Sequence, residues 1–286
     1  MNKRIQRAID HIESHQNDEL NIILLAEISA YSPFHFCRVF KAQMGESVMS
    51  YSTRIRLEAS SIEVSLGKKQ MIDVAADAGF KTPSGFLKAF KKHFGTTPTE
   101  YKRTNKQAIS NFQNIVMDKA EIVSRETAYV VYTRETGDYY KSADIAWERL
   151  SNNLNKLEEK YKGLPPTAGL EFDPNSAELL GICYDDPEVT KEEKIRYEAC
   201  IAWSEVEIEF LKTEQFNTKT IVSGKYAKAL HKGSYETSDD CWYGLYIWIE
   251  ANGFEFRNEP SFEKYLNTTD EVKSSELLTE IYVPVR

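Results

Sequence analysis

A glutamate and a tyrosine in the segment SFEKY are the residues of this chain best suited to hold or transform a small molecule. Glu263 and Tyr265 are two residues apart, so on a β-strand both side chains point to the same face. A carboxylate beside a phenol can bind a cation or serve as an acid–base pair. A buried carboxylate is costly unless it is paired, so Glu263 favours a positively charged ligand. The alternative is a solvent-facing glutamate on an edge strand.

Aromatic residues are concentrated in the same part of the chain. All four Trp and 13 of the 16 Tyr lie beyond residue 118. Aromatic surfaces suit a pocket for flat, hydrophobic, often cationic molecules, although for any single ring the simpler role is to fill the core. Beside Glu263 and Tyr265, the candidate ligand-binding residues are Tyr197, Glu280, Tyr282, Trp147 and Trp242.

Other kinds of reactive site lack their residues. The four Cys are far apart and form no C-x-x-C pair, and the five His form no H-E-x-x-H motif. No Ser-His-Asp set and no glycine-rich phosphate loop is recognisable. We therefore expect no metal, no cofactor and no catalytic residues, with the thiols buried as small hydrophobic groups.

The charge of the chain is divided unevenly. The net charge is −8, but residues 1–107 hold 16 Lys and Arg against 11 Asp and Glu, which leaves 20 against 33 for residues 108–286. Between residues 79 and 106, seven basic residues accompany a single acid, Glu100. A basic first part and an acidic second part predict two functions, the first of them phosphate binding.

Helical patterns fill the first part and repeat within it. Apolar spacing predicts helices over 3–15, 33–44, 48–66 and 83–94, with a short helix before the second and fourth. Ser32–Pro33 and Thr82–Pro83 start the matching helices, and Gly45 and Gly95 end them. FHFCRVFKAQMGESVMSY and GFLKAFKKHFGTTPTEY are internal copies, which predicts an all-α domain of two helix-turn-helix units.

The second part alternates strands with helices and is also duplicated. ETGDYY matches HKGSYE, and a helix with a Trp follows each. Tyr184 lies 14 residues before Glu198 and Leu266 lies 14 before Glu280, so these strands recur 82 residues apart, and Gly181 matches Glu263. We predict an α+β domain made of two strand–helix–strand–strand repeats. The stretch between the two repeats is interpreted as a polar connection.

The predicted organisation is a DNA-binding domain over 1–107, a linker over 108–118 and a ligand-binding domain over 119–286. No apolar run reaches the length of a membrane span, and the N-terminus lacks the apolar core of a signal peptide, so we expect a cytoplasmic protein.

At YSPFHFCRVFKAQMG and AADAGFKTPSGFLKAFKKHFGTTPTEY the chain resembles the AraC-type transcription regulators, over about residues 5–105. The resemblance implies that helices 33–44 and 83–94 each enter a major groove, about 34 Å apart, with helix 48–66 fixing their separation. The domain leads the chain, which is similar to the arrangement of the Rob-like regulators.

The same resemblance implies which residues meet DNA. Arg38 is expected to read a base, since a guanidinium can hold guanine O6 and N7 together, with a phosphate contact as the alternative. Cys37 departs from the longer polar residue that is frequent at its position. The second recognition helix is expected to supply phosphate affinity more than base reading. The complete expected set is Phe34, Cys37, Arg38, Lys41, Lys81, Thr82, Ser84, Gly85, Lys88, Lys91 and Lys92.

GICYDDPEVTKEEKIRYEACIAW, SFEKYLN and LLTEIYVPV resemble the GyrI-like domain, the drug-sensing module of several multidrug-responsive regulators. In such domains the Glu of the F-E-x-Y segment is the central acid of the cleft, which implies that role for Glu263. The two resemblances together imply a regulator that is not an enzyme, with double-stranded DNA, a small-molecule effector and RNA polymerase as partners and no membrane. A hydrolase that uses Glu263 and a nearby Tyr, and a nucleoid-type DNA binder whose second domain contacts only proteins, are the alternatives.

Overall fold

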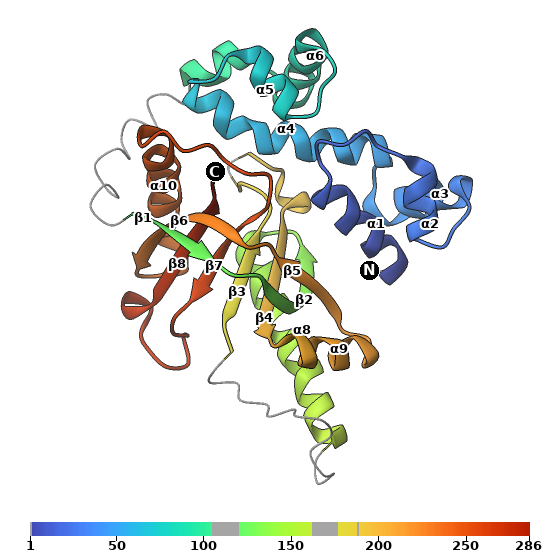
Figure 1. The fold of residues 1–286 in the computed structure, drawn as a ribbon, viewed down its shortest axis with the longest axis vertical. Helices are drawn as coiled ribbons and strands as arrows, with labels where there is room; N and C mark the ends of the chain where they lie inside the picture. Colours follow the sequence, from blue (N-terminus) through green and yellow to red (C-terminus); the bar gives the residue numbers. More distant parts are fainter. Residues whose placement is uncertain (1, 105–119, 162–176, 188) are drawn as a thin grey trace. The chain divides into compact units, whose positions relative to one another are not determined.

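The computed structural model describes residues 2–104, 120–161, 177–187 and 189–286 (Figure 1). The chain divides into two compact units, residues 1–110 and 111–286, each described by itself below. The predicted linker over 108–118 lies outside the described residues. No helix among the described residues combines the length and the apolar character needed to cross a bilayer.

The first unit is helical, as predicted. Its helices are α1 (Lys3–Ser14), α2 (Ile22–Ile28), α3 (Pro33–Met44), α4 (Val48–Leu66), α5 (Met71–Asp77) and α6 (Pro83–Phe94). The predicted bounds of α3, α4 and α6 are confirmed, because the residues that start and stop these helices are strong signals. Gly45 and Gly95 adopt φ of 69° and 73°, left-handed conformations that favour glycine and end α3 and α6.

Two separate apolar cores build this unit. One lies among α1, α2, α3 and the first half of α4, around Phe36, Phe40 and Ile55. The other lies among the second half of α4, α5 and α6, and includes Leu57 and Phe86. Each helix-turn-helix therefore packs on its own end of α4, and the two cores meet at the middle of that helix.

The second unit is an eight-stranded antiparallel sheet with three α-helices among its described residues. The strands are β1 (Glu121–Arg125), β2 (Ala128–Thr136), β3 (Leu179–Cys183), β4 (Arg196–Trp203), β5 (Asn217–Ile221), β6 (Gly224–Lys232), β7 (Ser261–Tyr265) and β8 (Leu278–Pro284). The helices are α8 (Tyr139–Tyr161), α9 (Glu205–Thr213) and α10 (Asp239–Ala251). Helix α8 packs on β2 and β4, and α10 packs on β6 and β8 (Figure 1).

The sheet order shows how the duplication is assembled. It runs β1-β6-β8-β7-β3-β4-β2-β5, so each repeat donates its first strand to the edge of the other. The repeats meet at the β7–β3 pair, where Glu263 lies directly opposite Gly181. The two residues that match by the spacing of 82 are thus neighbours at the centre of the sheet.

The structure differs from the sequence prediction at one helix. The stretch predicted to be a polar connection contains α9, whose first turn is held by a capping box between Ser204 and Glu207. The S-x-x-E spacing was the available signal, since it satisfies the free N–H groups of a helix start.

Candidate functional site

Glu263 lies at the centre of the second unit. It projects from β7, which is paired on both sides, and the residue is only 4% exposed. The face that it shares with Tyr265 is the one on which α8 and α10 pack, since Ile281, its neighbour across β8, belongs to the α10 core. A solvent-facing position on an edge strand is therefore excluded.

Five of the seven predicted ligand-binding residues form one hydrogen-bonded cluster. The hydroxyl of Tyr265 donates to Glu263 Oε2 at 2.6 Å, and Trp242 Nε1 donates to Glu263 Oε1 at 3.2 Å. The Tyr197 and Tyr265 hydroxyls are 2.9 Å apart. Trp147 Nε1 donates to the Tyr197 hydroxyl, also at 2.9 Å. Trp147 comes from α8 and Trp242 from α10, so both repeats contribute to what we call the Glu263 cluster.

The direction of this chain of hydrogen bonds follows from its ends. An indole N–H can only donate, so Tyr197 accepts from Trp147. The Tyr265 hydroxyl donates its single hydrogen bond to Glu263. The Tyr197 hydroxyl is therefore the donor in its hydrogen bond with Tyr265. The chain of donors thus leads to the Glu263 carboxylate, an arrangement that polarises each bond in turn.

Further aromatic rings surround the cluster. Tyr139 lies with its hydroxyl 2.9 Å from Cys183 Sγ and its ring 5.5 Å from that of Tyr197. The ring of Tyr235 lies 5.3 Å from that of Tyr265. The sequence interpretation missed Tyr139 and Tyr235, although they occupy matching positions in ETGDYY and HKGSYE, and that match was the available signal.

The floor of this site is buried, whereas its walls are partly open. Glu263 and Tyr197 are buried, but the rings of Tyr139, Trp147, Tyr235, Trp242 and Tyr265 belong to residues that are only half-buried. A cation that reached the carboxylate would lie among aromatic rings, whose faces attract cations through their quadrupoles.

Burial governs the electrostatics of the site. Burial raises the pKa of Glu263, and the hydrogen bonds from Tyr265 and Trp242 oppose that rise only in part. Burial, and then the charge of Glu263, raise the pKa of Tyr197 and of Tyr265 well above the ordinary value. The carboxylate lies in surroundings where its charge is poorly solvated, so a positive partner would be bound strongly.

The raised pKa of Glu263 predicts a pH dependence of folding. The folded state holds a proton that the unfolded state releases near the ordinary pKa of 4.5. The contribution of this group to stability is therefore greatest below pH 4.5 and falls as the pH rises to the folded-state value. We expect the difference in free energy of unfolding between the parent and Glu263→Gln to fall over this window, measured by denaturant unfolding at several pH values. A difference independent of pH would contradict the raised pKa.

Glu280 and Tyr282, the other two predicted ligand-binding residues, lie on the opposite face of the sheet. Tyr282 donates to Glu280 at 2.7 Å, and Lys228 donates to the other carboxylate oxygen at 3.1 Å. The ring of Tyr282 stacks on Phe262, whose side chain points away from that of its neighbour Glu263. Although β8 pairs with β7, these two residues belong to a separate polar cluster.

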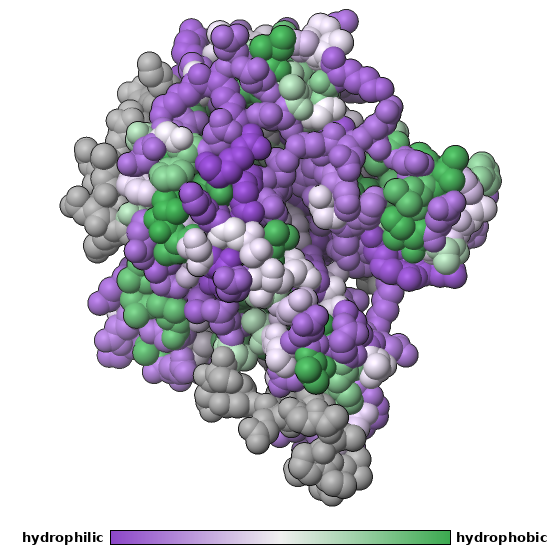
Figure 2. Space-filling view, viewed as in Figure 1, coloured by the Kyte–Doolittle hydropathy of each residue, from purple (hydrophilic) through white to green (hydrophobic). Residues whose placement is uncertain are grey.

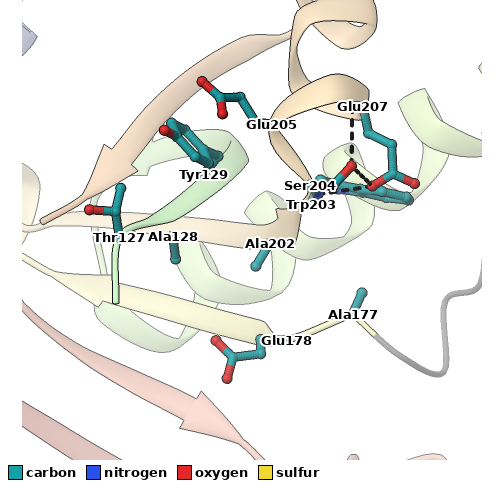
Figure 3. Close-up of a pocket in the computed structure, with 10 residues that line it drawn as sticks. All are labelled: Thr127, Ala128, Tyr129, Ala177, Glu178, Ala202, Trp203, Ser204, Glu205 and Glu207. Carbon is teal, nitrogen blue, oxygen red and sulfur yellow. Dashed lines mark hydrogen bonds between the residues drawn. The ribbon is translucent and has the colours of Figure 1, made fainter. Parts of the chain in front are cut away.

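A shallow hollow on the surface lies elsewhere in the second unit (Figure 3). Among its lining residues, Glu207 accepts hydrogen bonds from Ser204 at the start of α9, and Glu178 pairs with Arg125 and Lys264. These acids already stabilise a helix end and the sheet. None of the lining residues belongs to the Glu263 cluster, so this hollow does not explain the buried carboxylate.

In the first unit, the residues expected to read DNA are exposed along α3. Phe34 is 75% exposed, and the Arg38 guanidinium, which is also exposed, lies 5.7 Å from the Phe34 ring. Cys37 is exposed as well, so the expectation that the thiols are buried is wrong for this residue. Figure 2 shows apolar side chains gathered over α2 and α3, where Ile23 is also exposed. An exposed ring beside a guanidinium suits contact with a thymine methyl next to a guanine.

The corresponding surface of α6 is more basic. Lys88, Lys91 and Lys92 are exposed, and Ser84 is small. Thr82 is occupied as a helix cap, since its hydroxyl accepts from the Gly85 N–H at 3.1 Å. The remaining residues of the expected set are exposed or half-exposed, namely Lys41, Lys81 and Gly85.

Two family models match the chain. The GyrI-like small molecule binding domain matches residues 119–286, and a helix-turn-helix domain matches residues 25–104. The first match covers the whole described sheet with its helices, and the second covers α3 to α6.

Similar proteins match parts of the chain. An uncharacterised HTH-type transcriptional regulator, YbfP of Bacillus subtilis, is 30% identical over 117 residues, which are 41% of this chain and 40% of that protein. The right origin-binding protein of Escherichia coli is 31% identical over 93 residues, 32% of each chain. The chain thus spans less than half the length of these relatives. The EcmrR C-terminal domain superposes on 59% of this chain and 97% of its own, with 20% identity and a TM-score of 0.44.

Proposed function

This chain belongs to the family of GyrI-like small-molecule-binding domains and carries an AraC-type helix-turn-helix domain ahead of that domain, and we propose that it is a transcription regulator that responds to a hydrophobic cation bound at Glu263. The observation that carries the proposal is a buried carboxylate at the centre of the sheet, surrounded by aromatic rings from both repeats. DNA is the partner of the first unit, and RNA polymerase is the further partner that such regulation implies.

The chemistry of the site favours a cation over an anion. A second negative charge beside Glu263 would be repelled in poorly solvating surroundings. A cation would replace solvent as the partner of the carboxylate and would also gain from the faces of Trp147, Trp242 and Tyr235. Flat or bulky apolar substituents would cover the half-buried rings.

A thermal-shift experiment on the full chain tests this proposal. The probes are tetraphenylphosphonium, a hydrophobic cation, and triphenylphosphine oxide, a neutral analogue. Only a compound that binds the folded state raises the melting temperature. We expect a concentration-dependent rise with the cation and little change with the neutral compound. Equal behaviour of the two compounds would contradict the preference for a cation.

DNA binding is expected to reside in residues 1–107 and to weaken as salt is raised. The positive charge is concentrated there, while the rest of the chain is acidic, and phosphate contacts release counterions. A fragment of residues 1–107 and the full chain should both retard duplex DNA in low salt, and a fragment of residues 119–286 should not. A fragment 1–107 that stays folded without binding DNA would contradict this assignment.

Arg38 and Lys91 are expected to contribute differently to DNA binding. Arg38→Ala should weaken specific binding by about 1–3 kcal/mol and relax the preference at one base pair, because a bidentate contact to guanine is lost. Lys91→Ala should weaken binding to all sequences alike and reduce the salt dependence, because it removes a phosphate contact. Selection of sites from random duplexes distinguishes these effects. The division of roles is wrong if both variants change the selected sequence equally.

Hydrolysis of a small xenobiotic is the second candidate function, since a phenol 2.6 Å from a carboxylate can transfer protons. The direction of the hydrogen bonds argues against hydrolysis, because the Tyr265 hydroxyl donates its hydrogen bond to Glu263 and not to a bound molecule. Conversion of a bound compound by the full chain, lost in Tyr265→Phe, would favour the enzyme.

A further inference from the structure

The two helix-turn-helix units touch at a polar seam beside the middle of α4. Arg56 lies there, between Ile55 of the first apolar core and Leu57 of the second. These two cores share no residue among the described part of the chain, so apolar packing ties each unit to α4 and not to the other unit. A direct link between the units has to come from other contacts.

Arg56 supplies such a link. Its Nη2 donates to the backbone carbonyl of Asp18 at 2.5 Å, in the loop between α1 and α2. Its Nη1 donates to the carbonyl of Gly79 at 3.4 Å, in the turn between α5 and α6. One half-buried guanidinium therefore joins the loop of the first helix-turn-helix unit to the turn of the second. Its hydrogen bonds are charge-assisted, and the planar guanidinium holds them in fixed directions.

The turn at Gly79 has a conformation that lets the two helix-turn-helix units approach each other closely. Gly79 has φ of 70°, and a Cβ at this position would lie 3.2 Å from Arg56 Nη1 and 3.3 Å from the carbonyl oxygen of Gln16. The turn of the second helix-turn-helix, at Gly79, thus packs closely against the loop after α1, at Gln16. Lys81 and Glu19 add an exposed ion pair of 2.8 Å at the same seam, which is worth little by itself.

We infer that Arg56 fixes the orientation of the two helix-turn-helix units relative to each other, and thereby the spacing of the two DNA half-sites that this protein accepts. The inference rests on the proposed binding of DNA by both units. A change of one base pair moves a half-site by about 3.4 Å along the duplex and about 35° around it. A helix of 19 residues can bend and twist. Without the Arg56 hydrogen bonds, α4 would therefore tolerate a changed half-site spacing more readily than it does with them. Arg56 is a positioning residue in this account, because it contacts backbone and not DNA.

Selection of binding sites from random duplex DNA tests the inference, using the full chain as parent, Arg56→Met, Arg56→Lys and Glu19→Gln. Methionine keeps most of the aliphatic stem and removes every donor, lysine keeps the charge without the fork, and Glu19→Gln removes only the exposed ion pair. We expect the parent and Glu19→Gln to select two half-sites at one spacing. Arg56→Met, and to a smaller extent Arg56→Lys, should select the same half-site sequences over a wider range of spacings.

A quantitative readout follows from the selected site. The ratio of affinities for that site and for one lengthened by a base pair should fall towards one in Arg56→Met. An unchanged ratio and spacing in the folded Arg56 variants would overturn the inference, and Arg56→Lys serves if the methionine variant does not fold. A parent that selects a single half-site would overturn it too, since no spacing would exist to fix, whereas a parent that selects no sequence would instead refute DNA binding itself.

Discussion

Replacing Glu263 with glutamine is expected to lower the affinity for tetraphenylphosphonium by about 2–5 kcal/mol, the usual cost of removing one partner of a buried charge pair. Glutamine keeps the shape of the side chain and one of the two acceptor oxygens, and its amide NH2 replaces the oxygen that accepts from Tyr265 or from Trp242. The neutral analogue, which would register a rearrangement of the rings but not the lost charge, therefore separates the two effects. Isothermal titration calorimetry on both proteins measures it.

The neutral analogue and a second variant provide the controls. Affinity for triphenylphosphine oxide should be the same in the parent and in Glu263→Gln, because that compound does not use the charge. Glu280→Gln removes a carboxylate from the opposite face of the sheet and should leave the affinity for the cation unchanged. Equal affinity for the cation in the parent and in Glu263→Gln would show that Glu263 is not its partner. A loss in Glu280→Gln alone would move the site to the other face.

The sequence predicts the helical unit better than the sheet, for a physical reason. The bounds of α3 and α6 depend on local signals, since a proline begins each helix and a left-handed glycine ends it. The capping box of α9 is a local signal of the same kind, but this short helix lies in a stretch rich in charge, where its apolar pattern is weak. Local sequence signals therefore determine most helix bounds in the first unit.

The candidate site depends on contacts between residues that are far apart in sequence. Residues Glu263 and Gly181 could be matched by the spacing of the repeats, but that spacing does not show that the two are direct neighbours. The register of β8 against β7 decides which side chains share a face, and it places Ile281 beside Glu263 and turns Glu280 and Tyr282 away. A shift of one residue would reverse that outcome, which is why alternation along one strand could not assign them.

Gly181→Ala is expected to destabilise the second unit by about 1–3 kcal/mol and to weaken cation binding, because the added methyl overfills the centre of the Glu263 cluster. A Cβ at this position would lie closer than 3.0 Å to both the Tyr265 and the Tyr197 hydroxyls. Neither ring can retreat cheaply, since Tyr197 is fully buried and Tyr265 lies between the rings of Trp147 and Tyr235. Denaturant unfolding and calorimetry with tetraphenylphosphonium measure the two effects.

The sign of the effect separates this clash from the general effect of replacing glycine. Gly181 does not adopt a left-handed conformation, so alanine would by itself stabilise the chain by about 0.4–1 kcal/mol through the unfolded state. Tyr265→Phe removes the nearer hydroxyl, and in that background Gly181→Ala should cost less, which a double-mutant cycle detects as coupling between the two positions. A cost of Gly181→Ala that is the same with tyrosine or phenylalanine at 265 would mean that the glycine does not make room for the hydroxyl. If Gly181→Ala stabilises the chain, the centre of the cluster has space for a methyl group. The glycine opposite Glu263 would then not be required by the packing of the cluster.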